Sequence, residues 1–374
     1  IFLSNKIREN IMKIFLKSVA IIVIVVLATM LGYLGYMQAK FYRIEDKIAL
    51  DISNPQLDEL KLGQEYTVMT YNIGFGAYSP EYSFFMDKGN IKGEKLVSGK
   101  YGKAISKEDV EKNINGSLQL VKNINPDFAL LQEVDTRADR SYFVNQKDAF
   151  ENNMKDYSSV FAENFHSPYL FYPLNDPHGA VNAGLLSFSK YKVNSANRRS
   201  LPIDMSFITK FTDLDRCLSI QRINVESDKE LVLINAHLSA YDEGGIIRKK
   251  QFELLNNIID EEYQKGNYVI VGGDYNHALL GSKDIYTSNQ DIPSWVSELD
   301  NSSLNENASI VPAKNLATVA TCRACDIPYT KGINYTTTVD GFIVSKNVEA
   351  IAENIDNDFK YSDHNPVKLT FRLN

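Results

Sequence analysis

Cysteine is scarce in this sequence, which has three among 374 residues: Cys217, Cys322 and Cys325. So few cysteines exclude a small fold held together by a disulfide framework. Cys322 and Cys325 have the spacing of a zinc knuckle, but no second Cys or His pair lies near them in the sequence. We therefore expect a pair of loop cysteines, oxidised or reduced, rather than a zinc site.

An excess of basic residues is also missing. The chain has 40 Lys and Arg against 47 Asp and Glu, a formal net charge of −7. Residues 1–18 carry a net charge of +3, so about −10 remains for the rest of the chain. Proteins that bind nucleic acids by bulk electrostatics normally carry a basic face. The composition argues against that mode of binding and leaves a local basic groove open.

One long uncharged run stands out, residues 19–37 ("VAIIVIVVLATMLGYLGYM"). It is about long enough to cross a bilayer as a helix. Four basic residues and one acid precede it, which predicts a cytoplasmic stub at 1–18, a single transmembrane helix at 19–37 and an exported remainder at the cell membrane. A cleaved signal peptide is the alternative, and the bulky residues Phe41 and Tyr42 after the run argue against it.

The remaining chain predicts one mixed α/β domain. Residues 38–64 are charged and amphipathic and resemble a stalk, so we expect the domain at 65–374. Residues 76–105 lack a clear period and predict a long loop. Helices are expected from Ser106 to Asn125 and over 245–263. Apolar runs predict strands at "YTVMTYN", "DFALLQEVD", "AGLLSFS", "LSIQRINV", "LVLINAHLS", "YVIVGGDYN", "VDGFIVS" and "PVKLTFRL".

Polar residues stand at the ends of six of these strands. Any one of them would ordinarily be a turn or cap residue, but a shared pattern predicts that they meet at one sheet edge. Carboxylate and amide oxygens are hard ligands for Mg²⁺, Mn²⁺ or Ca²⁺, and a histidine can act as a base. This combination favours hydrolysis of a phosphate ester. The residues are Asn72, Glu133, His237, Asp274, Asn276, Asp340, Asp363 and His364.

The motifs "TYNIGFG", "LLQEVD", "NAHLSAY", "GGDYN", "VDGFIVS" and "YSDHNPV" occur in this order over residues 66–371. This ordered set resembles that of the endonuclease/exonuclease/phosphatase superfamily. The resemblance implies a four-layer α/β sandwich, in which two mostly antiparallel sheets pack face to face with helices outside. It also implies that Asn72 and Glu133 hold a metal ion, Mg²⁺ in the first instance, with Asp363 assisting or binding a second ion.

The same resemblance implies roles for the remaining polar residues. His364 would be the general base, oriented by Asp340, while Asp274 and Asn276 would orient the phosphate and the attacking water. Whether His364 or Asp274 takes the proton of the water stays open. His237 would stabilise charge on the phosphate. A histidine at this position resembles the deoxyribonuclease, sphingomyelinase and 5-phosphatase branches of the superfamily, because the abasic-site endonucleases tend to have an asparagine there.

Substrate selection is less constrained by the sequence. Arg137 and Arg140 follow Glu133 and are the first candidates for contacting the phosphate. Arg216 and Arg323 are further candidates. The aromatic residues of the long loop, Tyr78, Tyr82, Phe84 and Phe85, could stack on a base, touch lipid or simply pack. His277 is expected near the site and His166 in a loop.

These observations predict a membrane-anchored, metal-dependent phosphoesterase. Its substrate would be a phosphodiester or phosphomonoester, in nucleic acid or in a lipid headgroup, and no obligate protein partner is evident. The alternative is a binding module that keeps the same fold without turnover. Because a decayed site normally loses a metal ligand or its base, the completeness of the polar set favours the enzyme.

Overall fold

The computed structural model describes residues 2–93, 96–207, 209–226, 228–240 and 246–374. The chain divides into two compact units, Ile1–Arg43 and Ile44–Asn374. The first unit contains one long helix, α1 (Phe2–Lys40), which includes the predicted transmembrane segment 19–37. Its apolar part is long and apolar enough to cross a membrane, with a mean hydropathy of 2.7. By length and composition α1 could be a membrane anchor or a signal sequence.

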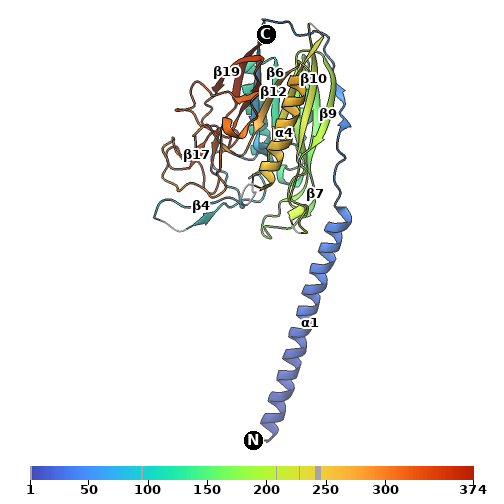
Figure 1. Cartoon of the computed structure of the whole chain (residues 1–374). Helices are drawn as coiled ribbons and strands as arrows, with labels where there is room; N and C mark the ends of the chain where they lie inside the picture. Colours follow the sequence, from blue (N-terminus) through green and yellow to red (C-terminus); the bar gives the residue numbers. More distant parts are fainter. Residues whose placement is uncertain (1, 94–95, 208, 227, 241–245) are drawn as a thin grey trace. The chain divides into compact units, whose positions relative to one another are not determined.

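The second unit is built on two seven-stranded sheets (Figure 1). The first sheet has the order β1 (Ile48–Ala49), β9 (Val193–Ser200), β10 (Cys217–Val225), β11 (Lys229–His237), β12 (Tyr268–Asp274), β18 (Asp340–Ser345), β15 (Ala308–Ile310). The second has the order β19 (Val348–Asn354), β20 (Val367–Leu373), β3 (Glu65–Asn72), β6 (Phe128–Ala138), β8 (Gly179–Ser189), β7 (Ser158–Leu170), β2 (Ile52–Ser53). The pairs β11–β12 and β3–β6 are parallel, and the other neighbours in both sheets are antiparallel.

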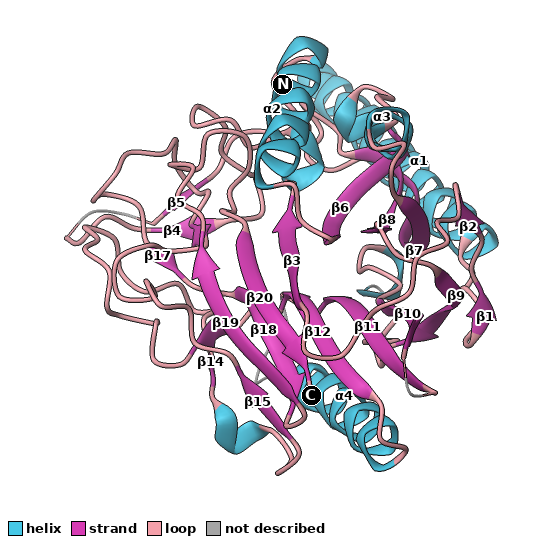
Figure 2. Cartoon of the chain, turned by 90° about the horizontal axis from the view of Figure 1, so that it is seen from above, coloured by secondary structure: helices cyan, strands magenta, loops and turns pink. Residues whose placement is uncertain are grey.

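Three helices cover the outer faces of these sheets (Figure 2). Helices α2 (Lys107–Ile124) and α3 (Gln146–Asn153) pack on the second sheet, and α4 (Ile246–Gln264) packs on the first. Helix α2 begins as predicted, because the Ser106 side chain accepts a hydrogen bond from the Asp109 amide at 3.1 Å. Helix, sheet, sheet and helix form the predicted four-layer α/β sandwich.

The loops of this sandwich contain short two-stranded ribbons. They are β4 (Lys88–Gly89) with β5 (Val97–Ser98), β13 (Ala278–Leu279) with β14 (Glu298–Leu299), and β16 (Cys322–Arg323) with β17 (Thr336–Thr337). The first ribbon lies within the predicted long loop 76–105. Residue 245, the expected first residue of the second helix, lies outside the described residues.

The core between the two sheets is largely apolar, with fully buried residues such as Val68 and Phe128 from one sheet and Leu233 and Ile270 from the other. Burying such a side chain contributes about 1.5–3 kcal/mol each. Apolar strand faces therefore hold the two sheets together and fix the strand ends relative to one another.

A buried polar bridge crosses this core. Gln132 of β6 donates through Nε2 to Oδ1 of Asn235 of β11 at 2.8 Å and to the Thr70 hydroxyl at 3.0 Å. The Asn235 amide in turn donates to the Leu131 carbonyl at 3.1 Å and to the Ser187 hydroxyl at 3.2 Å. Since buried amides are costly when unpaired, this bridge favours one relative position of the two sheets.

Residues 38–64 differ from the expected stalk. The second unit begins at Ile44, and strands β1 and β2 from this segment pair with β9 and β7 at the edges of the two sheets. Leu60 is fully buried in the core between the sheets. Two-residue edge strands are too short to produce a recognisable period, which explains why the sequence indicated a stalk.

Candidate active site

The predicted polar residues meet at one end of the sandwich, which we call the site end. Asp274 is the last residue of β12, and its register partners are His237, the last residue of β11, and Asp340, the first residue of β18. Asn72 is the last residue of β3 in the facing sheet. The strand ends thus bring together side chains that are up to some 270 positions apart, as inferred from the pattern.

Glu133 lies at an irregularity in β6. The β6–β8 register shifts between Leu131 and Val134, and Glu133 has a positive φ of 55°. Bulges of this kind redirect a side chain next to an active site. The Asn72 amide donates to Glu133 Oε1 at 3.2 Å and to Asp274 Oδ2 at 3.1 Å, so that Asn72 joins the two carboxylates.

The turn after Asn72 needs a glycine. Gly74 has a φ of +52°, and a Cβ atom there would lie 2.6 Å from the Tyr78 ring and 2.9 Å from Asp363 Oδ1. The Gly74 amide donates to Asn72 Oδ1 at 3.0 Å. Glycine is thus required both by the left-handed backbone and by the close approach of the Asp363 carboxylate.

His364 and Asp340 form a buried pair. Nδ1 of His364 lies 2.8 Å from Asp340 Oδ2, which leaves Nε2 directed toward Asp274 Oδ2 at 3.8 Å and Asp363 Oδ2 at 3.9 Å. Burial alone would lower the pKa of His364, but Asp340 and the neighbouring acidic groups raise it well above its usual value. The pair fixes the orientation of the ring, in agreement with the role that the superfamily resemblance implies for Asp340.

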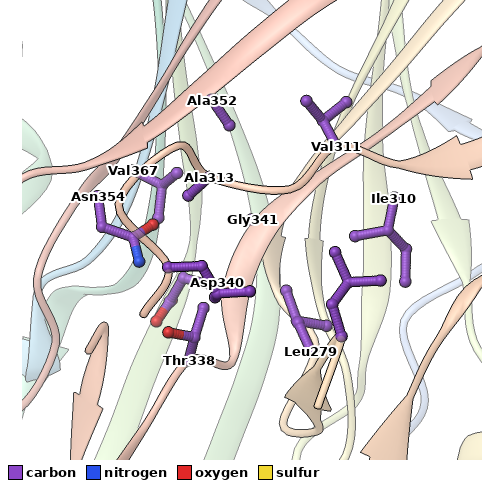
Figure 3. Close-up of a pocket in the computed structure, with 12 residues that line it drawn as sticks. Leu279, Ile310, Val311, Ala313, Thr338, Asp340, Gly341, Ala352, Asn354 and Val367 are labelled. Atoms are coloured by element: carbon purple, nitrogen blue, oxygen red, sulfur yellow. The ribbon is translucent and has the colours of Figure 1, made fainter. Parts of the chain in front are cut away.

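The apolar surroundings of Asp340 explain why its carboxylate needs the hydrogen bond from His364. Figure 3 shows Asp340 beside a small cavity lined mainly by aliphatic side chains, among them Leu279, Ile310 and Val311. This environment disfavours a bare carboxylate, and burial raises the pKa of Asp340. The hydrogen bond from His364 offsets part of that cost.

Asp274 lies at the centre of the cluster. Its Oδ1 accepts the Asn276 amide at 2.8 Å, and its Oδ2 lies 3.6 Å from Nε2 of His237. Burial raises the pKa of Asp274 to about 6. Burial, together with the nearby Arg216 cation, lowers the pKa of His237 well below its usual value, so that His237 is neutral. Asn276 adopts a left-handed φ of 51° and donates its side chain to the Leu238 carbonyl at 2.9 Å.

Solvent exposure separates the carboxylates into two classes. The side chains of Glu133 and Asp363 are 23% and 15% exposed, whereas that of Asp274 is 2% exposed and that of Asp340 is fully buried. Burial raises the pKa of Glu133, and the Asp363 carboxylate adds to this effect. Two accessible carboxylates beside the Asn72 amide have the oxygen chemistry of a hard divalent cation site, and a cation would offset the negative charge gathered there.

A second potential ligand group overlaps with this one. One ligand atom each from Asp274, Asp340 and His364 lies within 4.8 Å of the others, and such a buried group could also hold a metal ion. However, Nδ1 of His364 is already bonded to Asp340. The composition of the cluster fits a divalent metal, and the oxygen-rich, accessible side at Glu133 and Asp363 fits a hard cation better.

The two arginines predicted to contact substrate occupy different environments. Arg140 is buried, donates to both oxygens of Asp135 with a shortest distance of 2.8 Å, and has its guanidinium 3.9 Å from the Phe75 ring centroid. Arg140 therefore holds Asp135 and packs on Phe75, and its buried, paired guanidinium does not fit the expected direct contact with a phosphate. Arg137 is exposed on β6.

The other basic side chains named from the sequence are structural supports. Arg216 donates to the Leu238 carbonyl at 2.6 Å, and buried Arg323 donates to the Ser79 carbonyl at 3.1 Å. His277 is buried with Nδ1 2.7 Å from the Tyr275 carbonyl, and His166 lies 3.8 Å from Asp215. Tyr78 and Tyr82 are buried in the core beneath α2, so their packing role is confirmed.

One buried residue near Phe75, His178, was not predicted from the sequence. His178 is buried against Phe75, Phe84 and Phe85, and burial and the Arg140 cation lower its pKa to about 3. Its Nδ1 lies 2.5 Å from the Gly102 carbonyl oxygen, and because a carbonyl oxygen only accepts, Nδ1 is the donor. The sequence "NDPHGA" carries no signal for this contact except a histidine within a polar turn.

The three cysteines are free and buried, so Cys322 and Cys325, whose redox state the sequence left open, form no disulfide. Both nevertheless flank the site. Cys322 forms a backbone bridge with His364, and Sγ of Cys325 lies 3.8 Å from Asp363 Oδ2. Burial raises the pKa of Cys322 to about 12, so this thiol is neutral and poorly reactive.

Comparisons with known proteins agree with this geometry. No family model and no curated protein matches the sequence. A solved endonuclease/exonuclease/phosphatase protein from Beutenbergia cavernae is 16% identical, covers 83% of this chain and 72% of its own, and has a TM-score of 0.55. TDP2 from C. elegans is 16% identical over 84% of this chain and 77% of its own, with a TM-score of 0.51. A third such structure, from Bacteroides vulgatus, is 16% identical over 83% of this chain and all of its own, with a TM-score of 0.50.

At this level of identity the likeness concerns the fold. The sandwich layers and the clustered strand ends agree with the expectations drawn from the motifs, and the chain has the fold of the endonuclease/exonuclease/phosphatase superfamily.

Proposed function

We propose that this protein is a membrane-anchored, Mg²⁺-dependent phosphoesterase whose catalytic unit lies outside the cell. The observation that carries the proposal is the joint presence, at one site end, of an oriented His364–Asp340 pair, buried Asp274 and the accessible carboxylates Glu133 and Asp363. The basic residues in the first part of α1, before the uncharged run 19–37, support the outward orientation.

Each group has a task in such a reaction. Asn72, Glu133 and Asp363 would hold the metal ion, which would supply Lewis-acid polarisation of the phosphate. Asp340 holds the His364 ring so that its Nε2 faces the cluster, where it is placed to exchange a proton with a water. Asp274 lies within 3.8 Å of that nitrogen and could take the same proton, so either residue can serve as the base.

The remaining polar groups would bind the phosphate. His237 is neutral and can donate one hydrogen bond to an oxygen that gains negative charge. The backbone amide of Asn276 fixes Asp274, and the Asn276 side chain is the next donor along the same turn. Exposed Arg137 is the proposed contact for a second phosphate or a more distant part of the substrate.

A hydrolysis panel tests the proposal. Purified full-length protein in detergent would be assayed with Mg²⁺ on single- and double-stranded DNA, RNA, sphingomyelin, phosphoinositides and bis-p-nitrophenyl phosphate. We expect hydrolysis of at least one member that is lost with EDTA and restored by Mg²⁺. Glu133→Gln and His364→Ala should each lower the rate by about 10²–10⁴-fold.

The matched control is Glu349→Gln, which changes an exposed glutamate on the edge strand β19 and should leave the rate unchanged. Wild-type turnover that Glu133→Gln leaves intact would contradict the assigned site. Saturable binding of one of these ligands without any turnover would instead support the non-catalytic binding module.

A further inference from the structure

Two loops at the site end expose apolar side chains that have no role in the proposed chemistry. They are residues 171–178 between β7 and β8 and, between β9 and β10, the described residues 201–207 and 209–216, which we call the 201–216 loop. We call their exposed members, Phe171, Tyr172, Leu174, Met205 and Phe207, the apolar rim. Tyr172, Leu174 and Phe207 are 70%, 84% and 56% exposed. Gathered exposed apolar side chains of this size mark an interaction surface.

Strand register places both loops at the same end as the site. Gly179 pairs with Leu170 and Val181 with Ala138, the last residue of β6 beyond Glu133. In the other sheet Cys217 pairs with Ser200, and the next residue of β10 pairs with Ala236, adjacent to His237. Figure 1 shows both loops, in green and yellow-green, at the lower end of the second unit.

The first loop is braced, so its apolar residues cannot easily fold inward. Asp176 Oδ2 accepts the Gly102 amide at 2.9 Å, and His178 donates to the Gly102 carbonyl. The Tyr172 ring contacts Phe85 at 5.5 Å between centroids, and Phe85 contacts His178 at 6.1 Å. This aromatic row runs from the interior outward and holds Tyr172 on the surface.

In the second loop the side chain of Lys210 lies next to two aromatic rings. Nζ of Lys210 lies 5.1 Å from the Phe207 ring centroid and 4.8 Å from that of Phe211. Lysine beside exposed aromatic rings is a composition suited to the membrane–water interface, where the rings enter the headgroup region and the amine reaches phosphate.

The chain itself brings a membrane close to this end. The second unit starts at Ile44, whose amide donates to Asp215 Oδ2 at 2.6 Å within the 201–216 loop. Helix α1 ends at Lys40. Four residues of extended chain span at most about 14 Å. With α1 in a bilayer, the site end is therefore tethered close to the bilayer surface.

We propose that the apolar rim docks on the lipid bilayer, so that the site opens toward the headgroup layer. This inference rests on the anchored topology of the proposed function. The occupant is the bilayer rather than a second copy of the chain, because the tether from α1 joins the second unit at Ile44, whose amide is bonded to Asp215 in the loop that carries part of the rim.

Depth-dependent fluorescence quenching tests the docking directly. The chain has one tryptophan, Trp295, and the substitution Trp295→Phe would first remove its fluorescence. A single tryptophan would then be introduced by Tyr172→Trp, by Phe207→Trp or, as a control, by Ile351→Trp. Each full-length variant would be reconstituted in phosphatidylcholine vesicles with and without brominated acyl chains. Ile351 is 65% exposed on β19, at the edge of its sheet opposite to β7.

We expect brominated lipid to lower the emission at positions 172 and 207 by roughly half, and to leave position 351 unchanged, since interfacial groups enter the acyl boundary. If brominated lipid leaves the emission at positions 172 and 207 as unchanged as at position 351, in protein that resists carbonate extraction, the docking is overturned while the anchor stays in place. Extraction of the protein by carbonate would overturn it as well, because the tether would be absent. Crosslinking of the rim between two copies would overturn it in favour of a dimer.

A second readout separates docking from catalysis. The double variant Tyr172→Ser/Phe207→Ser should lower hydrolysis of a vesicle-embedded phosphate ester about tenfold while leaving that of soluble bis-p-nitrophenyl phosphate unchanged. Equal loss on both substrates would overturn the docking role. Quenching at the rim in a protein without any turnover would support docking and contradict the proposed function alone.

Discussion

The buried bridge between Gln132 and Asn235 gives a quantitative prediction that needs no knowledge of the substrate. Replacing Asn235 with Leu removes the acceptor of Gln132 Nε2 at 2.8 Å and the donor to the Leu131 carbonyl at 3.1 Å. Each buried polar group left unpaired costs about 1–3 kcal/mol. Gln132 keeps its bond to Thr70 at 3.0 Å, so its own loss is partial. We expect Asn235→Leu to lower the free energy of unfolding by about 2–4 kcal/mol.

The double variant is the stricter test. When Gln132→Met is added, both partners become apolar and fewer buried groups remain unpaired, so the double variant should be less destabilised than the sum of the single changes by about 1–3 kcal/mol. Urea unfolding of the full chain in detergent, followed by Trp295 fluorescence, measures all three free energies. Asn152→Leu on the exposed face of α3 is the control and should shift stability by less than about 0.5 kcal/mol. Additive effects of the two changes would refute the coupling.

Two further predictions concern titrating groups. Asp340→Asn should lower the pKa of His364, because burial then acts without its nearest compensating charge, and an NMR titration of the histidines that left this pKa high would contradict the pairing. Glu262, bonded to Arg222 at 2.6 Å, has a pKa lowered to about 2, so its contribution to stability is present above the ordinary pKa of 4.5 and is lost as the pH falls through about 2. Glu262→Gln should thus destabilise by about 1–2 kcal/mol at pH 7 and by progressively less below pH 4.5 in urea unfolding curves, and a constant difference across this range would rule out the linkage.

The elements that the sequence predicted are those with uninterrupted apolar runs or clear caps. Strands such as β12 ("YVIVGGD") and β18 ("DGFIVS") are buried on both faces, so every position favours apolar residues. Strands β7, β9 and β19 were not predicted. The sequence of β9, "VNSANRRS", is mostly polar, and its pairing with β10 is decided by the long-range register rather than by local preference.

The clustering of the candidate site residues was predictable because most of them stand next to the ends of apolar strands, whereas the residues that support them were not predictable. Asp274 and His237 end apolar runs, and the shared pattern indicates a common edge. Arg140 looked like a phosphate contact because it follows Glu133 by seven residues, yet its ion pair with Asp135 and its stacking on Phe75 depend on the three-dimensional return of the chain. No sequence pattern distinguishes a buried arginine from a surface one at such a position.

The register of His237, Asp274 and Asp340 across three adjacent strands has a consequence for how this protein can change. A one-residue insertion within any of these strands would turn that side chain to the opposite face and disrupt the site. The loop between β9 and β10 carries none of these three residues, so a change in its length does not alter this register. Changes in that loop can therefore alter the apolar rim while the row of three residues stays in place.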